Sequence, residues 1–380
     1  MNKRLFFTVT NDLVFDQRMI RICTSLAGAG YDVTLVGRLQ RDSPTLTPQP
    51  FRQHRLSTWF RRGKGFYLEY NLRLFFYLLT QKMDGICAID LDTLLPCYFV
   101  SRLRHIPRVY DAHELFCEMQ EVVSRPFVYN MWKKVERFGV PKFRHGYTVN
   151  GLIAQEFKKM YGVEYAVIRN MPVLAPGPMT APPIGLSLPT TAAPIAPPLP
   201  PGRFILYQGA VNEGRCFETL IPAMQTVNAP LVICGEGNFL AQARSLVRQH
   251  GLEEKVLFRG RVRPEELKAI TRAAFAGVTL FDRRGTSNYY SLANRFFDYI
   301  HAGIPQIAVN YPAYREINNS GLIAVLIDEP GIREIAAALN RLLDNTQLYQ
   351  TLVENCRQAR LRYNWQEEEQ KLIRLYQEIL

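Results

Sequence analysis

The sequence lacks the features that mark exported and membrane-spanning proteins. The opening residues Met1 to Arg4 and the apolar run Leu5 to Val9 are too short for a secretory signal. The longest apolar runs, such as Leu74 to Thr80, fall far short of the roughly 20 residues that cross a bilayer. We therefore expect a protein that is neither exported nor membrane-spanning.

Cysteine is scarce and follows no paired spacing. The chain has seven cysteines, an odd number, without the repeated motifs of structural metal sites. This usage indicates free thiols in a reducing compartment. We therefore predict that the cysteines bind no metal and that the protein works in the cytoplasm, free there or on the inner face of its membrane.

A dinucleotide fingerprint is also missing. After the first predicted strand the chain reads Thr10-Asn11-Asp12-Leu13, where a nicotinamide-binding domain would show G-x-G-x-x-G. The absence of these glycines argues against a dehydrogenase.

Acidic residues are outnumbered, with 34 Asp and Glu against 46 Lys and Arg and a formal net charge of +12. Such a chain attracts anions. Cations and aromatic rings gather between Phe51 and Phe76, a mixture that suits either contact with an anionic membrane or an ordinary solvated loop and helix face. Nucleic acid is not predicted as a partner, because no stacking platform or recognised binding module accompanies the charge.

Proline marks the division of the chain into domains. Residues 172–201 hold eleven of the 24 prolines and almost no charge, which predicts an extended linker. We predict a first domain over residues 1–171, a linker over 172–202, a second domain over 203–362, and a last helix over 363–380 that returns to the first domain. At 380 residues the chain is long enough for two domains.

Both predicted domains show short apolar strands alternating with amphipathic helices. In the first domain, a strand at Leu5 to Val9 precedes a helix that Asp16 caps and Gly30 ends, and Asp32 to Val36 forms the next strand. In the second domain, the predicted strands are Phe204–Tyr207, Leu231–Cys234, Val256–Phe258, Val278–Phe281, Gln306–Val309 and Ile323–Leu326, with helices at Phe217–Val227, from Pro264, and near Arg295–His301. This alternation predicts an α/β fold of two facing, doubly wound Rossmann-like domains with a cleft between them.

Two segments of the second domain predict phosphate contacts. One is the helix start at Ser291-Leu292-Ala293-Asn294, where backbone N–H groups carry partial positive charge and Arg295 adds a cation. The other is the loop from Gly209 to Arg215 after the first strand of that domain, in which glycine permits close backbone approach and arginine matches phosphate oxygens. In the helix, Asp298 is placed either to bind the hydroxyls of a ribose or to lie as a surface carboxylate.

The motif Ser291-Leu292-Ala293-Asn294-Arg295, with Phe297-Asp298-Tyr299 and Ala302-Gly303-Ile304-Pro305, resembles the donor-binding motif of glycosyltransferase family 4. The likeness extends over nearly the whole chain, apart from the proline-rich linker and residues 51–76. Its further motifs are Tyr207-Gln208-Gly209, Cys234-Gly235-Glu236-Gly237, Val256-Leu257-Phe258-Arg259-Gly260, Tyr110-Asp111-Ala112-His113-Glu114 and Thr148-Val149-Asn150.

The resemblance implies a GT-B fold and a retaining glycosyltransferase that needs neither a metal nor another cofactor. Such an enzyme moves a sugar from a nucleotide diphosphate, UDP or GDP, to a hydroxyl of a glycan, lipid-linked or other acceptor. It also implies roles for single residues. Arg215 and Arg295 would stabilise the leaving diphosphate, Asp298 would bind the ribose, and His113 would contact the donor sugar. The remaining implied donor contacts are Gly209, Arg259, Gly260 and Val262, together with the backbone from Ser291 to Asn294. The enzyme thus predicted is a hexosyltransferase-type enzyme of polysaccharide biosynthesis.

The chain departs from the family pattern at two positions. Tyr290 stands where the first acid of the paired-acid motif is expected, and Ala210 aligns with an arginine of the family. These departures suggest one alternative, a non-catalytic nucleotide-sugar-binding protein. A nucleotide-sugar epimerase of the same fold is a second alternative. Near the first-domain strand end, Asp90 and Asp92 are predicted either to contact the acceptor or to cap a helix.

Overall fold

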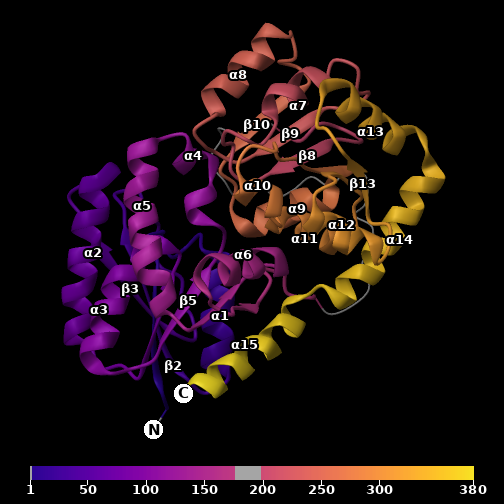
Figure 1. Ribbon diagram of the computed structural model, residues 1–380. Helices are drawn as coiled ribbons and strands as arrows, with labels where there is room; N and C mark the ends of the chain where they lie inside the picture. The colour runs from indigo at the N-terminus through magenta and orange to yellow at the C-terminus, as the bar shows by residue number, and fades with distance from the viewer. Residues whose placement is uncertain (1, 176–197) are drawn as a thin grey trace. The chain divides into compact units, whose positions relative to one another are not determined.

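The computed structural model describes residues 2–175 and 198–380 of the chain. It contains two compact units, Met1–Asn170 with Gln366–Leu380, and Met171–Trp365. Each unit has a parallel sheet accompanied by helices (Figure 1). The predicted α/β class with two doubly wound Rossmann-like domains is confirmed. Residues 176–197 of the predicted linker lie outside the described residues.

The sheet of the first unit has the order β3-β2-β1-β4-β5-β6-β7. Its strands are β1 (Arg4–Thr8), β2 (Asp32–Leu39), β3 (Arg52–Ser57), β4 (Gly85–Ile89), β5 (Arg108–Ala112), β6 (His145–Thr148) and β7 (Ala166–Val167). Its α-helices are α1 (Gln17–Gly28), α2 (Gly63–Thr80), α3 (Leu94–Arg104), α4 (Gln120–Val123), α5 (Pro126–Gly139), α6 (Gly151–Tyr161) and α15 (Trp365–Ile379), and short 3-10 turns cover Leu91–Thr93, Phe116–Glu118 and Val140–Lys142. The central strands β1 and β4 are buried along almost their whole length, because helices cover both faces of such a sheet.

The first unit includes the last helix of the chain. On α15, Tyr376 is almost fully buried, and its ring centroid lies 5.8 Å from that of Phe7 on β1. The first helix, α1, begins as the sequence predicts, because the side chain of Asp16 accepts a hydrogen bond of 3.1 Å from the backbone N–H of Met19. The helix ends at Gly28, and Gly30 follows in the left-handed region.

The sheet of the second unit has the order β10-β9-β8-β11-β12-β13. Its strands are β8 (Ile205–Gln208), β9 (Leu231–Cys234), β10 (Val256–Gly260), β11 (Ala276–Thr279), β12 (Gln306–Val309) and β13 (Ala324–Ile327). Its helices are α7 (Phe217–Ala223), α8 (Leu240–Gln249), α9 (Pro264–Ala273), α10 (Thr286–Tyr290), α11 (Asn294–Ala302), α12 (Pro312–Asn319), α13 (Ile332–Asp344) and α14 (Thr346–Arg362).

Two predicted boundaries in the second unit are wrong. Helix α7 stops at Ala223 rather than Val227, because Pro222 interrupts it and the chain turns from there. Strand β11 lies two residues earlier than predicted, because Ala276 and Gly277 are the residues that pair with β8. As a result, Phe281 lies beyond the end of the strand, at the carboxyl edge of the sheet.

Both sheets reverse their strand order beside the first strand of the unit. In the first unit this switch point lies between β1 and β4, and in the second between β8 and β11. Ligands of doubly wound sheets bind beyond the carboxyl ends of the strands at such points. Within residues 2–175 and 198–380, no helix is both long enough and apolar enough to cross a bilayer.

Candidate functional site

The loop after β8 lies against the loop after β9. The backbone N–H of Gly209 donates to the carbonyl of Cys234 at 3.0 Å, and that of Val211 donates to Glu236 at 2.9 Å. The approach is so close that a Cβ atom on Gly235 would lie 1.8 Å from the carbonyl oxygen of Gly209. Glycine at position 235 therefore allows the predicted phosphate loop to take this course.

Arg295 points from the first turn of α11 toward the carboxyl ends of β8 and β11. Its residue is 7% exposed, and its guanidinium makes two long contacts of 3.4 Å, to the carbonyls of Gln208 and Leu280. Its buried Nε atom has no hydrogen-bond partner in the part of the chain that the structure describes. The guanidinium is thus held at the sheet edge, and its N–H groups make only long hydrogen bonds with the described residues.

Arg215 shares an aromatic platform with Arg295. The guanidinium carbons of Arg215 and Arg295 lie 4.4 and 4.9 Å from the centroid of the Phe281 ring. Arg215 also donates to the side-chain oxygen of Asn288 at 2.9 Å. A cation over an aromatic face is held without neutralising its charge, so both arginines retain their full charge at the β8–β11 switch point.

The helix start before α11 has fewer available donors than the sequence suggests. The N–H of Ser291 donates to the carbonyl of Asn288 at 3.2 Å, and the N–H of Ala293 donates to the hydroxyl of Tyr314 at 3.0 Å. Two of the four backbone groups predicted to meet a diphosphate, those of Ser291 and Ala293, are therefore engaged within the protein. The side chain of Leu292 is buried.

Asp298 is oriented by a chain of polar side chains. Gln208, at the end of β8, donates to the Asp298 carboxylate at 2.8 Å, and Thr271 on α9 donates to the Gln208 side-chain oxygen at 2.7 Å. These contacts join α11 to β8 and α9. The carboxylate is therefore fixed near the residues that lead into the Gly209 loop.

The residues predicted to meet the base lie at the end of β10, the edge strand beside β9. Arg259 forms an ion pair of 3.1 Å with Glu266 on α9. Gly260 is in the left-handed region, and a Cβ atom there would lie 3.8 Å from the Glu236 side chain. Val262 packs against the apolar core of the unit. The backbone at this strand end is thus placed beside the loop after β9.

In the first unit, His113 lies between two carboxylates. Its Nδ1 lies 3.2 Å from Asp90 Oδ2 and its Nε2 lies 3.2 Å from Asp111 Oδ2. The backbone N–H of His113 also donates to Asp90 at 3.0 Å. Behind them, buried Arg18 contacts the Asp111 carboxylate with two guanidinium nitrogens, at 2.8 and 3.2 Å. Asp90 has a left-handed backbone with φ of 53° and makes no capping hydrogen bond, so the capping interpretation of Asp90 is wrong.

These contacts set the charge of His113. Burial alone would lower the pKa of His113, but the carboxylates of Asp90 and Asp111 outweigh it and raise this pKa well above 6.5. Burial alone would raise the pKa of Asp111, but Arg18 and His113 outweigh it and lower this pKa to about 2. A histidine that stays protonated at neutral pH does not accept a proton, so the geometry favours a positioning role over a basic one.

Asp92 lies beside this cluster and accepts a hydrogen bond from the hydroxyl of Thr10. Burial and the neighbouring Asp90 raise the pKa of Asp92 to about 7. The carboxyl edge at the β1–β4 switch point thus holds a carboxyl group whose pKa is raised by burial and a neighbouring charge, as is common at functional sites.

Several residues that lie around Arg215 and Arg295, or around His113, are not singled out by the sequence. Phe281, Asn288 and Tyr314 have no recognisable motif, and Arg18 lies 93 positions from Asp111. Gln208 stands within a quoted motif, but only the fold reveals its contact with Asp298. Among the described residues, no three His, Cys, Asp or Glu side chains gather as metal ligands, and all seven cysteines are buried free thiols.

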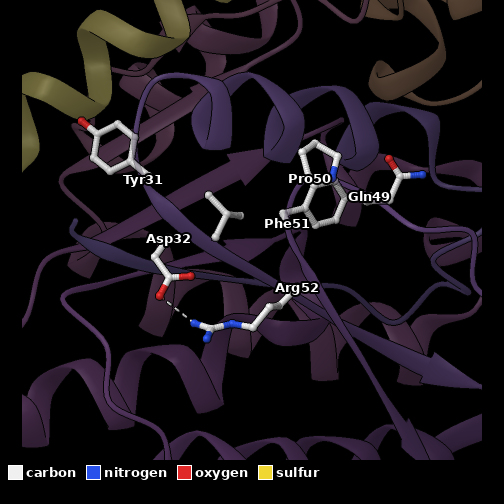
Figure 2. A pocket seen from close by; sticks show the side chains of 7 residues that line it. Tyr31, Asp32, Gln49, Pro50, Phe51 and Arg52 are labelled. Carbon is white, nitrogen blue, oxygen red and sulfur yellow. Dashed lines mark hydrogen bonds and ion pairs between the residues drawn. The ribbon is translucent and has the colours of Figure 1, made fainter. Parts of the chain in front are cut away.

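Two hollows of the first unit have none of Arg18, Asp90, Asp111 and His113 among the residues that line them. One, of about 300 Å³, lies at the amino ends of β2 and β3, where Asp32 and Arg52 form an ion pair of 2.8 Å (Figure 2). Another, of about 530 Å³, is lined by Lys133, Arg137, Pro141, Met160 and Tyr161. The first lies at the edge of the sheet opposite His113, so it is not part of the candidate site.

Residues 200–359 match the family model described as Glycosyl transferases group 1. No match to the whole sequence is found among curated proteins. Solved structures resemble the chain over nearly its full length. HepE of Anabaena in complex with UDP-glucose is 12% identical, with 99% of each chain covered and a TM-score of 0.74. Sucrose-phosphate synthase from Thermosynechococcus elongatus is 17% identical, with 99% of each chain covered and a TM-score of 0.73.

A third similar structure is WaaG, a glycosyltransferase involved in lipopolysaccharide biosynthesis. It is 13% identical, with 97% of this chain and 98% of that chain covered and a TM-score of 0.68. At such identities the likeness shows the fold, and the family model adds the activity. Residues 200–359 of the second unit therefore match a glycosyl transferases group 1 domain, and the chain has the GT-B fold of these neighbours. The prediction that the chain is a glycosyltransferase is confirmed.

Proposed function

We propose that this chain is a retaining, metal-independent glycosyltransferase that moves a sugar from a UDP- or GDP-sugar to a hydroxyl of a glycan or lipid-linked acceptor. The observation that carries the proposal is the pair of cations, Arg215 and Arg295, on the ring of Phe281 at the β8–β11 switch point. A diphosphate is the part of such a donor that requires two positive charges. HepE, which shares this fold, is in complex with UDP-glucose.

The chemistry follows from where charge develops. Cleavage of the bond between sugar and diphosphate leaves negative charge on the phosphate oxygens, so cations already fixed at that place stabilise the transition state. Arg215 and Arg295 supply that charge without a metal ion. The acceptor hydroxyl then attacks the anomeric carbon from the face that the diphosphate leaves and passes its proton to the departing phosphate oxygen. This step retains the anomeric configuration and needs no protein nucleophile.

In this proposal, neighbouring residues bind the nucleoside part of the donor. Asp298, oriented by Gln208, accepts hydrogen bonds from the ribose hydroxyls, while the backbone after β10, from Arg259 to Val262, meets the base. In the first unit, His113 orients a hydroxyl of the donor sugar. The seven free thiols support an enzyme that works in the cytoplasm.

Binding of nucleotides tests the cation pair directly. Calorimetry with UDP, GDP, ADP and their sugars should find one selective nucleotide, and Arg215→Ala or Arg295→Ala should weaken its binding about tenfold or more. Arg203→Ala is the matched control, because Arg203 lies 5.0 Å from the Phe275 ring, before the amino ends of the strands, in the same unit. Equal losses in all three variants would contradict the proposed site.

Turnover tests the rest of the proposal. With the selected donor and a glycan or lipid-linked acceptor, product NMR should show the donor's anomeric configuration, and a chelator should leave the rate unchanged. His113→Ala should reduce turnover more than nucleotide affinity. Conversion of the donor without an acceptor would indicate an epimerase instead, and binding without any turnover would indicate a non-catalytic protein, as the departures at Tyr290 and Ala210 allow.

A further inference from the structure

Exposed aromatic side chains are concentrated in one part of the first unit. In the described part of the chain, every exposed Phe and Trp lies between residues 59 and 138. These residues are Trp59, Phe60, Phe76, Phe99, Phe127 and Phe138. Trp59 is 85% exposed, which is unusual for the largest apolar side chain. Large exposed apolar patches mark interaction surfaces.

Helix α2 is apolar on two opposite faces. Its inward face buries Phe66, Tyr70, Leu74 and Leu78, at every fourth position. Its outward face repeats the same spacing with Leu68, Leu72 and Phe76, which are 66, 50 and 63% exposed. An ordinary surface helix has an apolar stripe on the inward face only. The outward stripe of α2 therefore has no role in packing the described unit.

Two further helices of the first unit also expose large apolar side chains. Helices α2, α3 and α5 lie side by side in the first unit (Figure 1). Helix α3 exposes Phe99 and Leu103, and α5 exposes Phe127 and Phe138. Lys64 on α2 lies 3.5 Å from the ring centroid of Phe127, so α2 and α5 meet at their amino ends. We call the exposed apolar residues of these helices, with Trp59 and Phe60, the three-helix face.

The turn that carries Trp59 and Phe60 is held in place. The carboxylate of Glu69 on α2 accepts hydrogen bonds from the backbone N–H groups of both residues, at 2.9 to 3.0 Å. Arg73 pairs with the same carboxylate at 2.8 Å and lies 4.7 Å from the centroid of the Trp59 ring. The two exposed rings are thus presented by a fixed turn rather than a loose loop.

The charge around the three-helix face is positive. Helices α2, α3 and α5 contain seven Lys and Arg residues and two Glu residues. Both glutamates are engaged, since Glu69 caps the Trp59 turn and Glu136 is 2% exposed in an ion pair of 2.7 Å with Lys133. The exposed Arg61 and Arg62 precede α2 directly. The three helices therefore present cations among apolar side chains, without an exposed carboxylate.

We propose that the three-helix face binds the surface of an anionic lipid membrane, with Trp59, Leu68, Leu72 and Phe76 inserted among the head groups. Aromatic and aliphatic side chains interspersed with Lys and Arg are the composition that membrane interfaces select. A second copy of the chain is a poor occupant, because two identical cationic faces repel each other. Nucleic acid is a poorer occupant, because bases would stack on the exposed rings but leave the exposed aliphatic side chains of Leu68, Leu72 and Leu103 without a partner.

Tryptophan fluorescence provides the test. Of the three tryptophans, Trp132 and Trp365 are buried, so Trp59 alone reports on the surface. The full chain is mixed with vesicles of phosphatidylcholine, with or without phosphatidylglycerol, in the absence of any donor. We expect a blue shift of the emission with the anionic vesicles, its loss in Trp59→Phe, and weakening as salt is added.

Co-sedimentation with the same vesicles quantifies the binding. The variant Leu68→Ser/Leu72→Ser/Phe76→Ser should lower the partition coefficient about tenfold or more. The control is Leu322→Ser/Ile332→Ser/Leu361→Ser, which removes three comparably exposed apolar side chains from the other unit and should leave binding unchanged. Circular dichroism and melting temperature verify that each variant is folded.

Three outcomes would overturn the proposal. They are absence of binding to anionic vesicles at low salt, equal loss of binding in the two triple variants, and an emission shift that depends on protein concentration without lipid, which would indicate self-association. Since no donor is present, failure here leaves the proposed glycosyl transfer intact, and failure of glycosyl transfer leaves this test unaffected.

Discussion

The side-chain amide of Gln208 donates a hydrogen bond of 2.8 Å to the carboxylate of Asp298. This contact joins the end of β8 to the middle of α11, and Thr271 fixes the other side of the amide. In the proposed site Asp298 binds the ribose hydroxyls, and this support sets the orientation of the carboxylate before the ligand arrives.

The variant Gln208→Leu should therefore weaken nucleotide binding although Gln208 itself touches no ligand in the proposed site. Loss of a hydrogen bond to a charged group corresponds to about 1.5–3 kcal/mol, so we expect about a tenfold or larger increase in Kd. Calorimetry with the selected nucleotide measures this change. Gln53→Leu, which removes a hydrogen bond to the Thr47 carbonyl in the first unit, is the control. An unchanged Kd in Gln208→Leu would show that Asp298 needs no such support.

Replacement of Phe281 tests the aromatic platform. Phe281→Leu removes the ring on which Arg215 and Arg295 lie, and cation–π contacts contribute about 0.5–2 kcal/mol each. Phe275→Leu makes the same change beneath Arg203. We expect similar decreases in melting temperature for both variants but weaker nucleotide binding only for Phe281→Leu. Equal nucleotide affinities of the Phe281→Leu and Phe275→Leu variants would exclude a role for the aromatic platform.

Gly235→Ala should disrupt the loop that precedes Arg215. An added Cβ atom would overlap the carbonyl of Gly209, and relieving such a contact costs about 1–3 kcal/mol in free energy of unfolding. Gly321→Ala is the control, because a Cβ atom there meets nothing within 4 Å. Urea denaturation measures both. Equal stabilities would show that the loop after β8 adjusts freely.

The buried ion pair of the first unit should matter for stability. Arg18→Ala leaves the fully buried Asp111 carboxylate without its guanidinium, which costs about 3–5 kcal/mol in free energy of unfolding. Arg52→Ala removes an exposed pair with Asp32 and should cost about 0–1 kcal/mol. Denaturation of the two variants in parallel measures the difference, and comparable losses would contradict the buried position of Arg18.

The cluster around His113 predicts a defined pH dependence. Because the folded state raises the pKa of His113, its contribution to stability is full below the ordinary value of 6.5, persists at neutral pH, and is lost as the pH rises through the raised pKa. Asp111, whose pKa is lowered to about 2, contributes above its ordinary value and loses that contribution as the pH falls toward 2.

The melting temperature of the wild type should therefore exceed that of His113→Gln by a margin that is largest at mildly acidic pH, below 6.5, and that shrinks as the pH rises from there through the raised pKa of His113. Thermal melts over this range measure the margin. A margin that vanishes already near pH 6.5 would show that Asp90 and Asp111 do not hold the proton on His113.

The order of strands and helices can be predicted from the sequence because it is local. Leu231–Cys234 and Gln306–Val309 are short apolar runs that match β9 and β12, and Asp16 caps α1 as its position before an amphipathic segment predicts. The two wrong boundaries have different causes, one local and one that depends on distant segments. Pro222 interrupts α7, and β11 is displaced because strand pairing, which joins distant segments, decides which residues enter a sheet.

The sequence by itself determined the α/β class, the glycosyltransferase motifs and the candidate cations Arg215 and Arg295, since each depends on residue type and spacing along the chain. Tertiary structure alone decided that both arginines meet on Phe281, that Gln208 orients Asp298, and that Asp90 and Asp111 hold His113 protonated. These contacts join residues between 2 and 90 positions apart. Only the packing of strand ends at the carboxyl edge of each sheet brings such groups together, and these contacts cannot be predicted from residue spacing along the chain.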